Sequence, residues 1–219
     1  MANLFKKRFS YRIVSGTFAE ITKYNGVGEE VTIPSELGGY PVESIGKSAF
    51  CFFQSLEEII IPDSVKSIGE EAFVSCKMMN RLKIGNGVVS IGKAAFELCW
   101  SLAAVDIPGN VKSIADRAFL CCISLATVNI SESVTEIGDS AFEFCANLRS
   151  IFIPDSVTHI GDDAFAHCDK TVRTSHSLTN CVGIDFPDTV EHFKFEIHCH
   201  AGSYAETYAK KNEIDFCII

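Results

Sequence analysis

LEEIIIPDSVKSIGEEAFVSC, residues 56–76, holds the pattern that decides the fold. Its Ala-Phe pair recurs every 23 residues through six copies, with no insertion or deletion between them. The pairs are Ala49-Phe50, Ala72-Phe73, Ala95-Phe96, Ala118-Phe119, Ala141-Phe142 and Ala164-Phe165. The cysteine that closes the segment recurs at the same step, as Cys76, Cys99, Cys122, Cys145 and Cys168. A fixed period of this length indicates a stack of repeating coils, each packed on its neighbours.

Each unit contains two short extended pieces and one turn. Apolar residues alternate from Ile59 to Ile61, which predicts a half-buried strand, and Pro62 ends it. A second extended piece ends at Ile68, and a short helical turn that holds Ala72-Phe73 follows. One coil of this size cannot bury its apolar side alone. We therefore expect a repeat β-solenoid whose coils stack at roughly 4.8 Å, with like residues above one another.

Glycine follows the second extended piece in most copies, and Ala115 replaces it in the fourth. The glycines are Gly46, Gly69, Gly92, Gly138 and Gly161. This column predicts a tight bend at which a Cβ atom would crowd the neighbouring coil, without a strict need for positive φ.

The segments outside the repeats predict caps for the open ends of the core. The start of the chain reads as a β-hairpin, with turns at Ser15-Gly16 and Asn25-Gly26. Near the end, Ser203 and Glu206 have the spacing of a capping box, so a helix is expected there, followed by a strand. We expect one domain, residues 1–219, divided into an N-terminal cap (1–30), six repeats (31–168), a degenerate coil (169–200) and a C-terminal cap (201–219).

The consensus L-x-x-I-x-I-P-x-S-V-x-x-I-G-x-x-A-F-x-x-C resembles the BspA-like leucine-rich-repeat family, also called the Treponema pallidum type. Residues 201–210 also resemble the C-terminal cap of that family. The resemblance implies a right-handed solenoid with a parallel sheet on one face and no enzymatic role. It also implies frequent use in bacterial cell-surface proteins that bind proteins of a host or of neighbouring cells.

Composition excludes several classes of protein. The 219 residues are 47% apolar and 21% charged, which is enough to bury a core and argues against disorder. The net charge is −9 and the longest basic run is Lys6-Lys7-Arg8, so nucleic acid is not an expected partner. The sequence has no run of 18 apolar residues, so no membrane insertion by a helix is expected.

The expected location stays open between two alternatives. The family resemblance favours the cell surface or secretion. The sequence shows no export signal at its start, and its ten cysteines lack the paired spacing of a disulfide framework, which favours a cytoplasmic location.

The cysteines and histidines that could form a catalytic or metal site are more simply explained by structural roles. The cysteine column is expected to consist of small buried side chains in the core. In His198-Cys199-His200, Cys199 has the phase of Ile61 and points inward, so the two histidines point apart and no metal site is expected. His167-Cys168 fails as a nucleophile pair because adjacent residues point apart. With no phosphate-binding or hydrolase motif present, we expect no enzymatic activity and no cofactor.

A partner should contact the outward strand residues, whose identity stacking does not restrict. Trp100 and Ile123, neighbours in one loop column, offer a second apolar surface. The protein-binding candidates are Ile60, Lys83, Asp106, Asn129, Phe152, Glu58, Arg81 and Trp100, and the same strand columns include Ala104, Thr127 and Ser150. The expected function is non-catalytic binding of a protein ligand by a monomer, either as an adhesin-like surface protein or as an intracellular scaffold or regulator.

Overall fold

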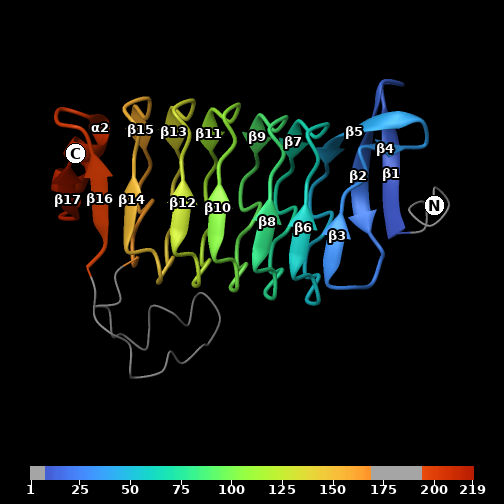
Figure 1. The fold of residues 1–219 in the computed structure, drawn as a ribbon, viewed down its shortest axis with the longest axis horizontal. Coiled ribbons are helices and arrows are strands. Elements are labelled where there is room, and N and C mark those ends of the chain that lie inside the picture. The colour runs from blue at the N-terminus through green and yellow to red at the C-terminus, as the bar shows by residue number, and fades with distance from the viewer. Residues whose placement is uncertain (1–7, 169–193) are drawn as a thin grey trace.

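The computed structural model describes residues 8–168 and 194–219 and shows a row of coils stacked along one long axis (Figure 1). The N-terminal hairpin lies at one end of the row, and helix α2 (Tyr204–Lys211) lies at the other. Successive coils repeat after 23 residues, so the predicted β-solenoid is confirmed.

The first face of the coils is made of short parallel strands. In register, Glu58 lies beside Arg81 and Ile60 lies beside Lys83. The hydrogen-bonded ladders are β3-β6-β8, β10-β12 and β14-β16-β17. The two interruptions follow the coils in which Gly85 and Ser131 replace the proline that ends the strand in the other copies. The strands are β3 (Glu30–Thr32), β6 (Glu58–Ile60), β8 (Arg81–Lys83), β10 (Ala104–Asp106), β12 (Thr127–Asn129), β14 (Ser150–Phe152), β16 (Glu196–Cys199) and β17 (Asp215–Ile218).

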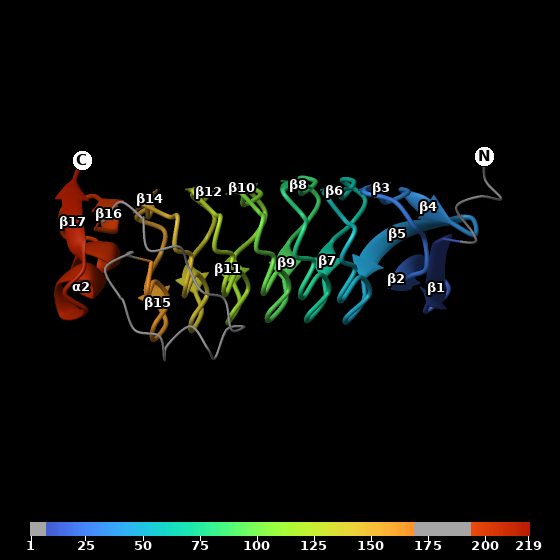
Figure 2. The ribbon, with the colours of Figure 1, turned by 90° about the horizontal axis from the view of Figure 1, so that it is seen from below.

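A second row of strands forms a separate face, as the view from below shows (Figure 2). Its order is β1-β2-β5-β7-β9-β11-β13-β15, with β4 paired to β5. The strands are β1 (Phe9–Val14), β2 (Phe18–Tyr24), β4 (Glu36–Leu37), β5 (Tyr40–Ile45), β7 (Ser67–Ile68), β9 (Ser90–Ile91), β11 (Ser113–Ile114), β13 (Glu136–Ile137) and β15 (His159–Ile160).

The predicted hairpin is present as β1 and β2, which pair antiparallel. Its turn lies at Ser15-Gly16, where both residues have positive φ, as the sequence predicts. Asn25-Gly26 does not close a hairpin, because β3 pairs with β6 and not with β2. The Asn25 side chain instead donates a hydrogen bond to the Ser10 hydroxyl, which ties the end of β2 to β1.

The third side of each coil takes the form of successive four-residue turns where a short helical turn was expected. In the second repeat, Ala72, Val74 and Cys76 each donate a backbone N–H to the carbonyl three residues earlier. Glu71 and Ser75 have positive φ, and so do the equivalent residues of every repeat. We call this side the turn edge: residues 48–52, 71–75, 94–98, 117–121, 140–144 and 163–167.

The turn edges bond to one another in one direction. Glu71, Phe73 and Ser75 donate backbone N–H groups to carbonyls of the next coil, at 2.9, 2.8 and 2.8 Å. The same three hydrogen bonds join every successive pair of repeats up to the last. The stack is therefore held by backbone hydrogen bonds on the turn edge as well as on its two rows of strands.

A ladder of phenylalanine rings fills the core. Neighbouring ring centroids from Phe50 to Phe165 lie 4.8 to 5.5 Å apart. Tyr24 stacks on the first ring at 5.1 Å, and Phe195 stacks on the last at 5.5 Å. At Gly69, a Cβ atom would lie 2.8 Å from the Ile45 carbonyl oxygen, which confirms the crowded bend without positive φ.

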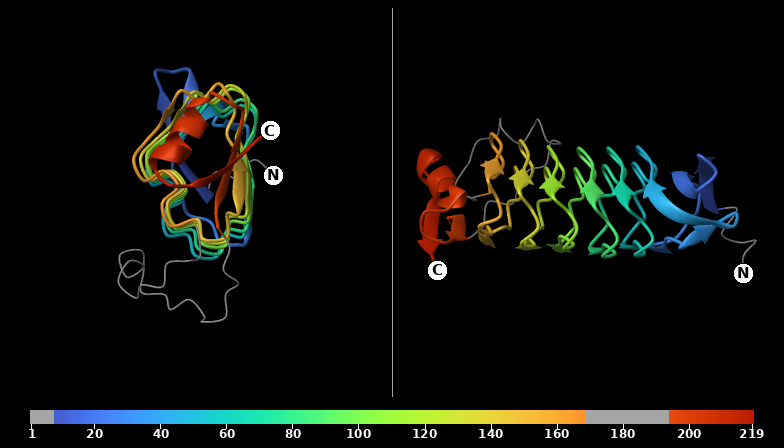
Figure 3. Two further views of the ribbon diagram at one scale, coloured as in Figure 1. Left: turned by 90° about the vertical axis from the view of Figure 1, so that its left-hand side faces the viewer. Right: turned by 90° about the horizontal axis from the view of Figure 1, so that it is seen from above.

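The cap at the C-terminal end follows the predicted pattern. The Ser203 hydroxyl accepts a hydrogen bond from the Glu206 N–H, and the Glu206 carboxylate accepts one from the Gly202 N–H. Ala205 and Tyr208 face the core, and the helix lies across the end of the coil outline (Figure 3). Of the expected degenerate coil, residues 169–193 lie outside the described residues, and β16 pairs in register with β14.

We expect the substitution Phe119→Ala to lower the free energy of unfolding by about 3–5 kcal/mol, because it removes a fully buried ring from the middle of the ladder. Urea unfolding followed by circular dichroism measures the loss. Phe52→Ala is the control: this ring is 67% exposed, so a change within about 0.5 kcal/mol is expected. Equal losses in the two variants would contradict the ladder's role.

Candidate functional site

The outward residues of the first row of strands form one continuous surface, which we call the strand face. Two columns make it up, with one residue from each column on each of β6, β8, β10, β12 and β14. They are Glu58, Arg81, Ala104, Thr127 and Ser150, and Ile60, Lys83, Asp106, Asn129 and Phe152. Most of these side chains are exposed, while Glu58, Ile60 and Phe152 are half-buried. The structure thus brings together every candidate residue except Trp100.

The N-terminal half of the strand face is charged. Arg81 forms an ion pair with Glu58 at 2.7 Å and approaches Glu30 at 3.7 Å. Lys83, on the same strand, has no carboxylate within 4 Å in residues 8–168 and 194–219. Lys83 lies beside half-buried Ile60, so it joins a free positive charge to an apolar surface.

The C-terminal half is polar and aromatic. The Asn129 amide donates a hydrogen bond to the Asp106 carboxylate at 2.6 Å. Phe152 meets the His200 ring edge-on, with centroids 5.7 Å apart, and His200 Nδ1 lies 2.9 Å from an Asp155 carboxylate oxygen. The sequence predicts that Phe152 is exposed. In the structure it is half-buried, because His200 packs against one side of its ring.

Trp100 does not lie on the strand face. It follows the turn edge of its coil, is half-buried, and has the Lys77 ammonium 3.7 Å above its ring centroid. Ile123, in the same loop column, is also half-buried. Trp100 and Ile123 are thus less exposed than the sequence predicts, and a cation from the neighbouring coil lies over the indole.

The cysteine column lies in the core, as predicted, and adds a hydrogen bond that the sequence does not reveal. Each thiol lies 3.2 to 3.4 Å from the carbonyl oxygen of the phenylalanine in the preceding coil and donates to it. Burial raises the pKa of the Cys76 thiol to about 12, and it raises the pKa values of Cys99, Cys122 and Cys145 as well. A protonated, buried thiol is a poor nucleophile.

In both histidine-cysteine pairs the cysteine is buried, as the sequence predicts. His198 and His200 both lie beside Phe152. Cys199 is buried, His198 pairs with Glu196 at 3.1 Å, and His200 pairs with Asp155. His167 stacks on Phe144, with ring centroids 4.5 Å apart. In the part of the chain that the structure describes, no group of three or more His, Cys, Asp or Glu residues could hold a metal ion.

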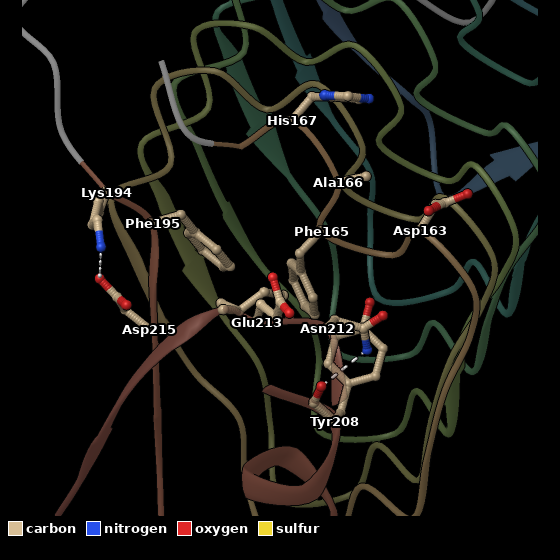
Figure 4. A pocket seen from close by; sticks show the side chains of 11 residues that line it. Asp163, Phe165, Ala166, His167, Lys194, Phe195, Tyr208, Asn212, Glu213 and Asp215 are labelled. Atoms are coloured by element: carbon tan, nitrogen blue, oxygen red, sulfur yellow. Dashed lines mark hydrogen bonds and ion pairs between the residues drawn. The ribbon is translucent and has the colours of Figure 1, made fainter. Parts of the chain in front are cut away.

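A cavity of about 280 Å³ lies between the last turn edge and the C-terminal cap (Figure 4). Asp163, Phe165 and His167 come from the turn edge, while Tyr208 and Glu213 come from the cap. Sequence reasoning missed it because residues about 50 positions apart form it, and no short motif joins them. The only sequence signal for the cavity is the end of the repeat, because the last coil has no identical neighbour to cover it.

Comparison with known proteins identifies the repeat. A family model described as a BspA type leucine rich repeat region matches residues 43–172 in six copies. A leucine rich cell surface protein of Faecalibacterium prausnitzii is 33% identical with a TM-score of 0.56; the match covers 74% of this chain and 51% of that one. The chain therefore spans about half the length of that protein.

The leucine rich repeat protein of T. pallidum is 29% identical with a TM-score of 0.57, over 74% of this chain and 87% of that one. The pneumococcal vaccine antigen PcpA, at 22% identity and a TM-score of 0.59, shares the fold over 73% of this chain and 45% of its own. No curated protein sequence matches the chain. Among the described residues, no helix has the length and apolar character needed to cross a bilayer.

We expect stability to fall above about pH 9, because unfolding releases thiols that ionise near that pH while the folded core keeps them protonated. The contribution of Cys76 is complete below the pKa of an unfolded thiol and is lost as the pH rises toward about 12. Each such thiol costs about 1.4 kcal/mol per pH unit in that window. Urea unfolding at pH 8 and pH 10 measures the slope.

Cys76→Ala should make this slope shallower, and Phe119→Ala, which removes core packing but no thiol, should lower the stability and leave the slope unchanged. An identical slope for wild type and Cys76→Ala would show that the column does not titrate on unfolding.

Proposed function

The chain belongs to the BspA-type leucine-rich-repeat family of bacterial proteins, and from this membership we propose that it is a non-catalytic module that binds a protein ligand on its strand face. The observation that carries the proposal is the division between inward and outward columns. Inward residues such as Ile59 and Ile151 are at most 2% exposed and repeat in kind, while the outward columns change in charge and size from coil to coil. The stacking of coils explains the identity of the inward residues but not that of the outward ones.

The strand face offers a partner two kinds of contact. Ile60 and Lys83 present an apolar surface next to an unpaired ammonium, which suits a partner with a carboxylate beside an apolar side chain. Phe152 presents an aromatic ring four coils from Ile60, at roughly 19 Å for a spacing of 4.8 Å. Asp106 and Asn129, between them, supply hydrogen-bonding groups.

We further propose that the protein acts at the cell surface or after secretion, as an adhesin-like binder. The F. prausnitzii relative is described as a cell surface protein, and this supports the proposal. An intracellular scaffold or regulator is the second candidate, favoured by the free thiols of eight of the nine described cysteines. The ninth, Cys121, is disulfide-bonded, which fits the surface proposal better.

A photo-crosslinking residue at Asn129 should capture the partner in the source cells, and the double variant Lys83→Asp, Phe152→Asp should reduce that capture by at least tenfold. Lys112→Asp together with Val89→Asp is the matched control, because both residues are exposed away from the strand face. Immunoblotting and mass spectrometry measure the adduct. Equal loss in both double variants, or in neither, would contradict binding at the strand face.

Protease added to intact source cells should remove the protein while a cytosolic marker survives. Immunoblotting before and after lysis follows both bands. Protection of the protein until lysis would contradict the surface proposal and favour the intracellular scaffold.

A further inference from the structure

The last turn edge lacks the acceptors that every earlier one has. In each preceding repeat, three backbone N–H groups bond to carbonyls of the next coil. In the sixth repeat the equivalent donors belong to Asp163, Phe165 and His167, which line the cavity of Figure 4. Within residues 8–168 and 194–219, no backbone carbonyl accepts from any of the three.

Tyr208 lies on the cap side of the middle donor, Phe165, with the two rings edge to face at 6.2 Å. Burial raises the pKa of its phenol to about 12, and hydrogen bonding to the backbone of Phe165 and Ala164 acts in the opposite direction. The phenol also lines the cavity beside Phe165. The N–H groups of Asp163 and His167, on either side, donate to no backbone carbonyl of the described residues and are available to a ligand.

The cavity also has an excess of negative charge over an aromatic floor. Lys194 is its only lysine or arginine among the described lining residues, and it is paired with Asp215 at 3.2 Å. Neither Asp163 nor Glu213 has a cationic partner in the described part of the chain. The rings of Phe165 and Phe195, 5.5 Å apart, line the same space (Figure 4).

We propose that this cavity binds a short extended peptide segment that carries a lysine or arginine side chain. Two peptide carbonyls accept the N–H groups of Asp163 and His167, as a further coil would do. The aliphatic stem of the basic residue packs on the aromatic rings, and its head pairs with the carboxylates of Asp163 and Glu213.

A peptide fits this site better than an anion does. The two free N–H groups would suit a carboxylate or phosphate, but the unpaired carboxylates repel one. Neutral carbonyl acceptors joined to a cationic side chain satisfy both sets of groups at once. The volume of about 280 Å³ suits one or two residues. This site lies apart from the strand face and does not depend on the function proposed for it.

Titration of the full chain with the capped tripeptide acetyl-Ala-Arg-Ala-amide tests the proposal, followed by amide nitrogen–proton NMR. The Asp163 and His167 amides should shift saturably at millimolar peptide. The analogue with citrulline in place of arginine keeps the backbone and removes the charge, and it should bind about tenfold more weakly. The analogue with glutamate should not bind.

The double variant Asp163→Asn, Glu213→Gln should weaken arginine-peptide binding by about tenfold, and Glu132→Gln, Glu136→Gln, which removes two exposed acids outside the cavity, should not. The NMR spectrum reports whether each variant is folded. Absence of a saturable shift, equal binding of the arginine and citrulline peptides, or preference for the glutamate peptide would each overturn the proposal. These three outcomes are all measured on the wild-type protein, so the proposal can be tested even if a variant does not fold. Crosslinking at Asn129 reports on the strand face separately.

Discussion

The fixed step between coils is the constraint on which the rest of the structure depends. Backbone hydrogen bonds set it on the turn edge, where Phe73 donates to Ala95 at 2.8 Å and the same bond recurs in the following coils. The phenylalanine rings then lie 4.8 to 5.5 Å apart, a distance at which aromatic rings stack favourably. The Ala-Phe pairs keep this step at a constant 23 residues. Extra residues occur only outside the paired segments: Glu30 pairs with Glu58, 28 positions later, because β4 is inserted between their strands.

The turn edge has a direction, and so the two ends of the stack present different chemical groups. At the N-terminal end, carbonyls of the first turn edge need donors, and the Tyr24 N–H supplies one to Ala49 at 2.8 Å. At the C-terminal end, the N–H groups of Asp163, Phe165 and His167 have no carbonyl partner among the described residues. Each cap also adds a ring to the ladder, Tyr24 at one end and Phe195 at the other. The two ends of the stack therefore need opposite hydrogen-bonding groups, but both caps cover the core in the same way, with an aromatic ring.

The repeat made most of the fold predictable, because identity at a fixed step reveals which side chains stack. It gave the inward columns, the strand positions, the bend at Gly69 and the capped helix after Ser203. It could not give interactions that join different residue types across coils. The thiol bond from Cys76 to Phe50, the cover of Trp100 by Lys77 and the break in the ladder after β8 all depend on three-dimensional neighbours. The cavity was equally hidden, because its lining residues, such as Asp163 and Glu213, come together only where repetition stops.

Because of the regular repeat, different residues determine the stability of the stack and the recognition of a ligand. The inward columns and the backbone bonds hold the stack whatever side chains the strand face carries, since residues such as Lys83 and Asp106 do not pack in the core. Substitution there changes a contact surface at little cost to folding. The ends of the stack differ from its sides. Which groups can bind there depends on the backbone donors and acceptors that the repeat leaves unpaired. The sides of such a protein are thus free to vary with the ligand, whereas its ends favour partners that resemble another coil.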